Sequence, residues 1–400
     1  MSLSKPNREP ACIMAYSHDG FGLGHLRRNT NIASRFVRST PGSNVLLLVG
    51  CPPGAFFASR EGIDLIKIPS IVKVAAEMYR PLSLSISVER MKMLRASMIQ
   101  KAAEIFKPDL FLVDHVPTGV WSELLPTLQM LRQLENPPRI VLGMRDIVDS
   151  PEVVRQLWKR ENIYEVVASY YDEVLIYGSE SVFDTASQYG LDVEFPGRIR
   201  YCGYVCSEEP YRAREEMRAE LEIEEEKLVV VTAGGGGDAY PILETCLDAF
   251  RLLGDYPPCE AIVIAGPLMD PAQTEHLKQR ANGMKVRVLN HVQDNLSYIN
   301  AADVVITMGG YNTLCEVLRL KKKSLVLPRC GPRAEQVMRA RLFAERQLID
   351  VIYPDRLSPQ HLAKRLMMDL ERDDYPVSDN PVPLDGAVQA ASCLSELYES

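Results

Sequence analysis

The sequence has no long hydrophobic run and no paired-cysteine pattern. The 400 residues contain no apolar stretch of roughly 18 residues, the length needed to span a bilayer. The N-terminal segment MSLSKPNREPACIMAYS lacks the basic start and continuous apolar run of a signal peptide. The nine cysteines form no CxxC motif and stand at no zinc spacing relative to histidine. These absences predict a cytoplasmic protein in a reducing compartment.

The chain also has fewer basic than acidic residues, 45 against 53. The formal net charge is −8, and an acidic surface repels nucleic acid, which is a polyanion. We therefore expect no nucleic-acid partner. An anionic substrate would need local positive groups or free backbone amides to hold it.

The common nucleotide and metal motifs are missing. The first glycine-rich loop, SHDGFGLGH at 17–25, contains GxGxG rather than GxGxxG, and no acidic residue ends the next apolar segment. These two features argue against NAD binding. The glycine run at 233–238 (AGGGGD) is not followed by the Gly-Lys-Ser/Thr of a P-loop, and no DxD motif with metal-ligand character occurs.

The chain instead alternates short apolar segments with helical ones. Segments such as 44–49 (NVLLLV), 110–113 (LFLV) and 228–232 (LVVVT) are typical of parallel strands covered on both faces. The pattern breaks over 196–211 and then restarts. At roughly 100–200 residues per domain, we expect two doubly wound α/β domains, 1–204 and 205–400. A final helix over 386–398 follows a proline-rich linker and can pack back on the first domain.

Three glycine-rich loops follow strands, where open α/β sheets bind ligands. The first carries two histidines, His18 and His25, and a histidine at a helix start can act as a general base. Its alternative is a tight strand-to-helix turn. The second, AGGGGD, offers amides to a phosphate or is a flexible linker. The third, TMGGYNTLCE at 307–316, either binds ligand or forms a capping box between Thr313 and Glu316.

Residues 289–344 carry the most specific pattern: an aspartate before a strand, a Gly-x-x-Thr-x-x-Glu helix start, an apolar strand ending in proline, and a helix containing glutamine. The matching residues are Asp303, Gly310, Thr313, Glu316, Pro328 and Gln336. With the other two loops, this block resembles the GT-B glycosyltransferases, in particular the group of the bacterial N-acetylglucosaminyltransferase of the peptidoglycan lipid intermediate and the plant galactolipid synthases. The resemblance implies two Rossmann-like domains with the active site in the cleft between them. Between 60 and 200 it is only generic.

The resemblance implies a role for each matching residue. Glu316 would hold the ribose of a nucleotide sugar, which we expect to be a UDP-sugar. Because this donor is a substrate, no cofactor is expected. His25 would be the general base, with His18 as the second candidate. The family loop carries Ser or Thr among its glycines and AGGGGD does not, so backbone amides must contact the phosphates. The implied donor-binding set is Gly22, Gly24, Gly234, Gly235, Gly236, Gly309, Gly310, Asn312, Thr313 and Glu316, with His291 and Val292 at the base and Glu335 and Gln336 at the sugar hydroxyls.

The expected chemistry is inverting transfer without a metal, because helix dipoles and amides stabilise the leaving diphosphate. Asp114 ends a strand and either orients His25, binds the acceptor or is a solvated acid, and His115 is equally open. Arg145 and Asp146 either line the acceptor pocket or form a structural pair, and the structural pair is the preferred interpretation. Two other functions stay open: a sugar-nucleotide epimerase or hydrolase of the same fold, and a non-catalytic nucleotide-sugar-binding subunit.

The acceptor is a hydroxyl compound, lipid-linked or small. Residues 90–106 (RMKMLRASMIQKAAEIF) predict a helix with a stripe of Met91, Leu94, Met98 and Ala102. The stripe faces the core, or it makes a peripheral contact with the inner face of the membrane.

Overall fold

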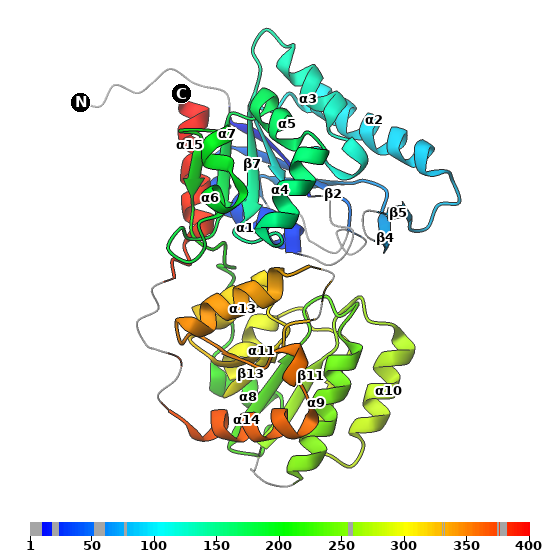
Figure 1. Ribbon diagram of the computed structural model, residues 1–400, viewed down its shortest axis with the longest axis vertical. Coiled ribbons are helices and arrows are strands. Elements are labelled where there is room, and N and C mark those ends of the chain that lie inside the picture. The colour runs from blue at the N-terminus through cyan, green and yellow to red at the C-terminus, as the bar shows by residue number, and fades with distance from the viewer. Residues whose placement is uncertain are drawn as a thin grey trace, which may run out of the picture. The chain divides into compact units, whose positions relative to one another are not determined.

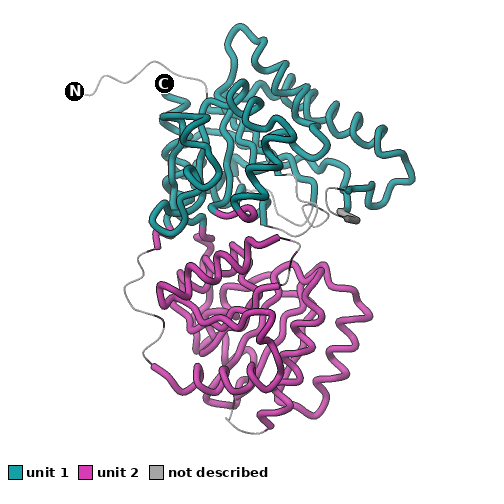
Figure 2. The backbone as a smooth tube through the Cα atoms, in the orientation of Figure 1, with its two compact units in different colours: residues 1–146, 151–205, 385–400 teal, residues 147–150, 206–384 magenta. Residues whose placement is uncertain are grey.

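The computed structural model describes residues 10–17, 24–51, 61–75, 78–254, 259–329, 331, 333–373, 376 and 382–400. The chain forms two compact units (Figures 1 and 2). Unit 1 comprises Met1–Asp146, Pro151–Val205 and Asp385–Ser400, and unit 2 comprises Ile147–Ser150 and Cys206–Leu384. Unit 1 is therefore discontinuous in sequence, and most of unit 2 is inserted between its second and third segments.

Unit 1 is built on a parallel sheet with the strand order β3-β2-β1-β6-β7-β8-β9. Every residue of β6 is buried, as expected when helices cover both faces of a sheet. The strand order reverses direction between β1 and β6. The strands are β1 Cys12–Ser17, β2 Asn44–Val49, β3 Ile63–Lys67, β6 Leu110–Asp114, β7 Arg139–Arg145, β8 Glu173–Tyr177 and β9 Ile199–Tyr201.

Helices of unit 1 flank this sheet, and the last of them comes from the far end of the chain. Helix α15, Gly386–Glu399, packs against α1, Gly24–Ser39, and the hydroxyls of Ser395 and Thr40 lie 3.3 Å apart. The structure thus places the final helix on unit 1. The other helices are α2 Val88–Phe106, η2 Val120–Ser122, α3 Leu125–Arg132, α4 Pro151–Arg160, α5 Ile163–Tyr170, α6 Thr185–Tyr189 and α7 Leu191–Glu194.

Helix α2 faces the core with a different stripe from the predicted one. Its buried residues are Met91, Arg95, Ile99 and Ala103, whereas Leu94 is exposed. The expected stripe was wrong because an arginine occupies the inward face: Arg95 forms an ion pair with buried Glu123 at 2.5 Å. A small antiparallel hairpin, β4 Ile71–Ala75 and β5 Met78–Pro81, packs beside α2.

Unit 2 contains a second parallel sheet, ordered β12-β11-β10-β13-β14-β15, which reverses direction between β10 and β13. Alternate residues of β10 enter different cores: Val229 and Val231 pack on one face, Leu228 and Val230 on the other. The strands are β10 Lys227–Thr232, β11 Cys259–Ile264, β12 Val286–Leu289, β13 Val304–Thr307, β14 Lys323–Val326 and β15 Asp350–Val351.

The helices of unit 2 complete its layers, and α14 packs against α9 (Figure 1). Within the described part of the chain, no helix has both the length and the apolar character that crossing a membrane requires. The helices are α8 Arg214–Glu220, α9 Tyr240–Leu253, α10 Pro271–Ala281, α11 Asn295–Ala301, α12 Tyr311–Arg319, α13 Glu335–Glu345, η3 Pro354–Arg356 and α14 Pro359–Glu371.

Candidate functional site

The reversal of strand order in unit 1 brings the ends of β1 and β6 together. Ser17 and Asp114, the last residues of these strands, are register partners. Ligands of open α/β sheets bind outside the carboxyl ends of strands at such a switch point. His25 enters the same region as the second residue of α1, whose first residue is Gly24. His18 and Gly22 lie outside the described residues.

His25, Arg28 and Asp114 form one polar cluster at this edge. The Arg28 guanidinium donates through Nη2 to both carboxylate oxygens of Asp114, at 2.9 and 2.6 Å. His25 Nδ1 lies 3.3 Å from Asp114 Oδ2 and 3.1 Å from Arg28 Nη2. Residues three apart on a helix share a face, which is why His25 and Arg28 reach the same carboxylate.

The charged groups of this cluster are buried and paired with each other. Asp114 and Arg28 are fully buried, so the interpretation of Asp114 as a solvated strand-end acid was wrong. The Arg28 guanidinium also lies over the Tyr177 ring, 5.6 Å from its centroid. Burial, and then the charge of Asp114, raises the pKa of the Tyr177 hydroxyl well above its usual value, so the hydroxyl stays neutral. Buried charges are tolerated when they are paired, and Arg28 is the partner of Asp114.

His115 and Asp146, at the ends of β6 and β7, contact other residues of unit 1. The His115 ring stacks on Trp158 with centroids 6.5 Å apart. Asp146, the residue after β7, is buried and accepts a hydrogen bond from the Tyr204 hydroxyl at 2.8 Å. The sequence predicted Arg145 as the partner of Asp146, and the hydrogen bond from Tyr204 was not predicted.

In unit 2 the switch point lies between β10 and β13, where Thr232 and Thr307 are register partners. The glycine loop follows β10. Gly236 has φ +84°, and a Cβ there would lie 2.0 Å from the Ala265 carbonyl oxygen. Gly235 accepts from the Leu268 amide at 2.9 Å. The run is therefore a tight turn packed on the loop after β11, not a flexible linker.

The turn uses some of its own amides. The Gly236 amide donates to the Ala233 carbonyl at 3.3 Å, and Gly236 is buried. Gly234 is exposed, with φ +63°, and no described atom lies within 4 Å of the position of a Cβ on it. An anion can approach the open side of the loop at Gly234, while Gly236 maintains its shape.

The third loop leads from β13 into α12. Its N-cap is Gly310, and the cap has no side-chain hydrogen bond. Thr313 is the third residue of α12, so the capping-box interpretation of Thr313 and Glu316 was wrong. Gly309 has φ +76°, and a Cβ there would lie 2.7 Å from Val326 Cγ1. Asn312, the second residue of the helix, is half-buried.

Glu316 lies buried one turn inside α12 and takes part in a short hydrogen-bond chain. The Asn295 amide donates to Glu316 Oε2 at 2.9 Å, and the Thr232 hydroxyl donates to Asn295 Oδ1 at 3.4 Å. The chain links the end of β10, the start of α11 and α12. Asn295 was missed because an amide in QDNLSY carries no motif, and only the fold brings it to Glu316.

The other predicted donor residues lie around the same sheet. His291 is exposed and Val292 half-buried in the loop after β12. Glu335, the first residue of α13, is buried and accepts from Arg339 Nη1 at 3.0 Å. Gln336 accepts from the Arg329 amide at 3.2 Å, which ties α13 to the loop after β14.

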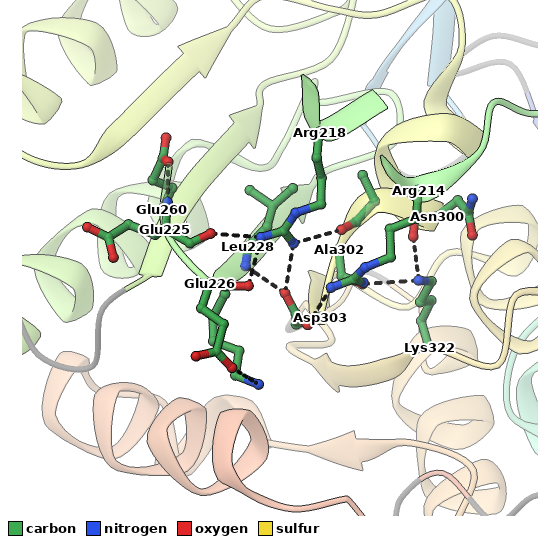
Figure 3. Close-up of polar contacts among 12 residues, drawn as sticks. Arg214, Arg218, Glu225, Glu226, Leu228, Glu260, Asn300, Ala302, Asp303 and Lys322 are labelled. Atoms are coloured by element: carbon green, nitrogen blue, oxygen red, sulfur yellow. Dashed lines mark hydrogen bonds and ion pairs between the residues drawn. The ribbon is translucent and has the colours of Figure 1, made fainter. Parts of the chain in front are cut away.

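The opposite, amino end of this sheet is held by charge (Figure 3). Arg214 donates to Asp303 Oδ1 at 2.7 Å, Arg218 to Oδ2 at 3.1 Å, and the Leu228 amide to Oδ2 at 2.7 Å. Burial alone would raise the pKa of Asp303, but these donors outweigh it and lower the pKa. Burial lowers the pKa of the nearby Lys322 to about 8. Asp303 is therefore a structural residue that joins α8, β10 and β13.

The arrangement of titratable side chains also bears on metal binding. Within the described ranges, no three His, Cys, Asp or Glu side chains are grouped as ligands for one ion.

Comparison with known proteins identifies relatives over both units. Residues 228–382 match the glycosyltransferase family 28 C-terminal domain. An uncharacterized glycosyltransferase of Methanosarcina acetivorans is 23% identical over 82% of each chain. The UDP-N-acetylglucosamine–N-acetylmuramyl-(pentapeptide) pyrophosphoryl-undecaprenol N-acetylglucosamine transferase of Rubrobacter xylanophilus is 28% identical over 32% of this chain and 35% of its own length.

Solved structures share the fold. The calicheamicin glycosyltransferase superposes with a TM-score of 0.60 and 14% identity over 98% of this chain and 99% of its own. A candidate UDP-N-acetylglucosamine 2-epimerase of Listeria monocytogenes gives 0.64 and 14% over 98% and 96%. The expected resemblance and the α/β fold class are confirmed. The chain is a glycosyltransferase of the GT-B fold, and residues 228–382 of its unit 2 match the family 28 C-terminal domain.

Proposed function

We propose that this glycosyltransferase moves a sugar, with inversion, from a UDP-linked donor to a hydroxyl acceptor. The observation that carries the donor assignment is Glu316, a buried carboxylate beside the switch point of unit 2. Its Oε2 is held by Asn295, so the carboxylate is oriented before any ligand arrives. A fixed carboxylate is well suited to accept hydrogen bonds from the two hydroxyls of a ribose.

The diphosphate would lie at the loops that precede α9 and α12. Backbone amides at a helix start and the helix dipole favour an anion. Gly234 and Gly310 leave space there, since no described atom lies within 4 Å of a Cβ position on either residue. As the sugar–phosphate bond breaks, negative charge grows on the leaving diphosphate, and these dipoles stabilise it without a metal ion.

His25 would supply the general base. In the tautomer that carries its proton on Nδ1, next to Asp114, the imidazole would accept the proton of the acceptor hydroxyl at Nε2. The hydroxyl oxygen then forms the new bond to the anomeric carbon, and the bond from that carbon to the diphosphate oxygen breaks. Arg28 shares the Asp114 carboxylate, so this buried anion would have two cationic neighbours once the imidazole is protonated.

The acceptor would be a compound with an apolar part. Unit 1 exposes a group of large apolar side chains on β5, the segment after it, and α2, and α2 packs against β5. Exposed apolar groups gathered on neighbouring elements favour a lipid-linked acceptor or a peripheral contact with the cytoplasmic membrane face. The group comprises Met78, Leu82, Leu84, Met93 and Leu94.

Two alternatives use the same donor site. A sugar-nucleotide epimerase or hydrolase is supported by the fold shared with the Listeria epimerase candidate. Incubation with UDP-N-acetylglucosamine alone, followed by product analysis, separates them: free sugar indicates hydrolysis and a changed sugar indicates epimerisation. A non-catalytic binding subunit would bind donor and turn nothing over.

Binding of UDP-sugars tests the donor assignment. At one hundred times the dissociation constant, a donor should stabilise the chain by about 2.7 kcal/mol in a thermal-shift assay. Glu316→Ala should weaken UDP binding at least about tenfold, since a hydrogen bond to a charged group contributes about 1.5–3 kcal/mol. Glu345→Ala, on an exposed glutamate at the end of α13, is the matched control and should bind normally. Unchanged affinity in Glu316→Ala would remove the ribose assignment.

A further inference from the structure

An ion pair spans the carboxyl edge of the unit 2 sheet. Arg329, in the loop after β14, donates through Nη1 to Oδ2 of Asp238, which lies in the loop after β10. β13 lies between these two strands. The pair therefore bridges the exit of β13, where Gly309 and Gly310 lead into α12.

The pair stands where the proposed function places a diphosphate. Gly310 caps α12 without a side-chain hydrogen bond, and Gly234, in the same loop as Asp238, is exposed. An Asp238 carboxylate at this edge repels a diphosphate through like charge. Arg329 neutralises that carboxylate, so the ion pair reduces the negative charge that faces an incoming anion.

Arg329 is able to change partner. Its main chain is fixed, because its amide donates to Gln336 Oε1 at 3.2 Å. Its side chain is 32% exposed and that of Asp238 is 51% exposed, so breaking the ion pair costs little. A guanidinium forms stronger, bidentate contacts with phosphate oxygens, and a diphosphate carries more charge than one carboxylate.

We propose that Arg329 is a donor-binding residue: Asp238 holds it across the exit of β13 until the diphosphate of the donor takes its place. This inference rests on the proposed function and adds a side-chain cation to a site otherwise made of amides. Asp238 then acts as a competing anion, and removing its charge should favour the ligand.

Calorimetric titration of the full chain with UDP tests both residues. Arg329→Gln should weaken UDP binding at least about tenfold, because a charge-assisted hydrogen bond to the diphosphate is lost. Arg329→Lys should lose less, since it keeps the charge but not the bidentate geometry. Asp238→Asn should bind UDP about threefold more tightly or better, because Arg329 is released and like-charge repulsion is removed.

Arg280→Gln is the matched control. Arg280 forms ion pairs with Glu244 and Asp248 on α9 and should not affect UDP affinity. The melting temperatures of all variants should stay within a few degrees of the parent, since surface ion pairs contribute little.

Two results would overturn the inference while leaving the donor site intact: normal UDP affinity in Arg329→Gln while Glu316→Ala is impaired, or weaker binding in Asp238→Asn. If the parent chain binds none of UDP, GDP, ADP, CDP or dTDP, both the inference and the proposed function fail.

Discussion

The two units place different chemistry at the same topological position. At its switch point, unit 1 gathers ionisable side chains, with Asp114 and Arg28 buried beneath His25. At its switch point, unit 2 presents glycine turns and a bare helix start, with Glu316 set one turn inside the helix. In the proposed function, the same strand order thus serves proton transfer in unit 1, where it positions side chains, and anion binding in unit 2, where it positions glycine loops. The sequence surrounding the switch point determines which of the two chemistries each sheet supports.

The largest expected effect comes from a change at His25, in the cluster of unit 1. His25→Ala should lower turnover at least about a hundredfold, because a general base contributes about 10²–10⁴ in rate. UDP affinity should stay constant, since unit 2 holds the donor in the proposed scheme. Steady-state kinetics at saturating donor, with calorimetric binding alongside, measure both quantities.

His361→Ala is the matched control, because His361 is exposed on α14 and contacts the Arg356 carbonyl. Normal turnover in His25→Ala together with a collapse in His18→Ala would transfer the base to His18. Normal turnover in both variants would make Asp114 the better candidate. An unfolded His25→Ala chain would instead make the histidine a structural residue.

A smaller effect, on stability alone, should follow at the amino end of the unit 2 sheet. Asp303→Asn should lower the free energy of unfolding by about 2 kcal/mol, because two arginines and a backbone amide lose an anionic acceptor. Urea unfolding measures this loss. UDP affinity of the folded variant should be unchanged, which would separate charge that builds the sheet from groups that bind ligand.

The pH dependence has a definite sign. The folded pKa of Asp303 is lowered from its usual 3.8, so its contribution is fully present above about pH 4 and is lost as the pH falls through the folded pKa. The difference in stability between the parent and Asp303→Asn should therefore shrink in acid. A difference that grows in acid would contradict the ion-pair account.

The smallest expected effect concerns metal. If amides and Arg329 neutralise the leaving diphosphate, a chelator should change the initial transfer rate by less than about twofold. The assay compares rates in excess EDTA and after addition of magnesium or manganese. Activity abolished by EDTA and restored by either ion would mean that a bound cation, rather than the amides and Arg329 of unit 2, neutralises the leaving diphosphate.

Much of the sheet architecture could be predicted from local sequence. Buried parallel strands are nearly continuous apolar runs, so the predicted segment 228–232 coincides with β10 except for one residue. The helix start expected at the histidines of the first glycine-rich loop also agrees with α1, whose second residue is His25. The hairpin β4–β5 and the two-residue β15 were missed, since neither is a long apolar run.

The polar partners could not be predicted in the same way. Arg28 and Asp114 are 86 residues apart in sequence, and Arg95 and Glu123 are 28 apart. Neither arginine differs locally from a solvent-facing one, and both become buried only because the fold supplies a carboxylate. The capping-box prediction failed for a related reason: helix α12 begins at Tyr311, before the threonine that was expected to cap it.

The insertion of unit 2 has a consequence for synthesis on the ribosome. Residues 206–384 are synthesised as one segment and can fold before α15 is made. Helix α1, in contrast, lacks its packing partner until α15 has been synthesised. Until residues 386–399 are made, the side of α1 that α15 covers stays bare, and Leu394 is missing from the apolar group that it forms with Ile32 and Phe36 of α1 and with residues of the sheet. The unit that begins first in translation is thus completed last, and its nascent form exposes an apolar helix face that chaperones can bind.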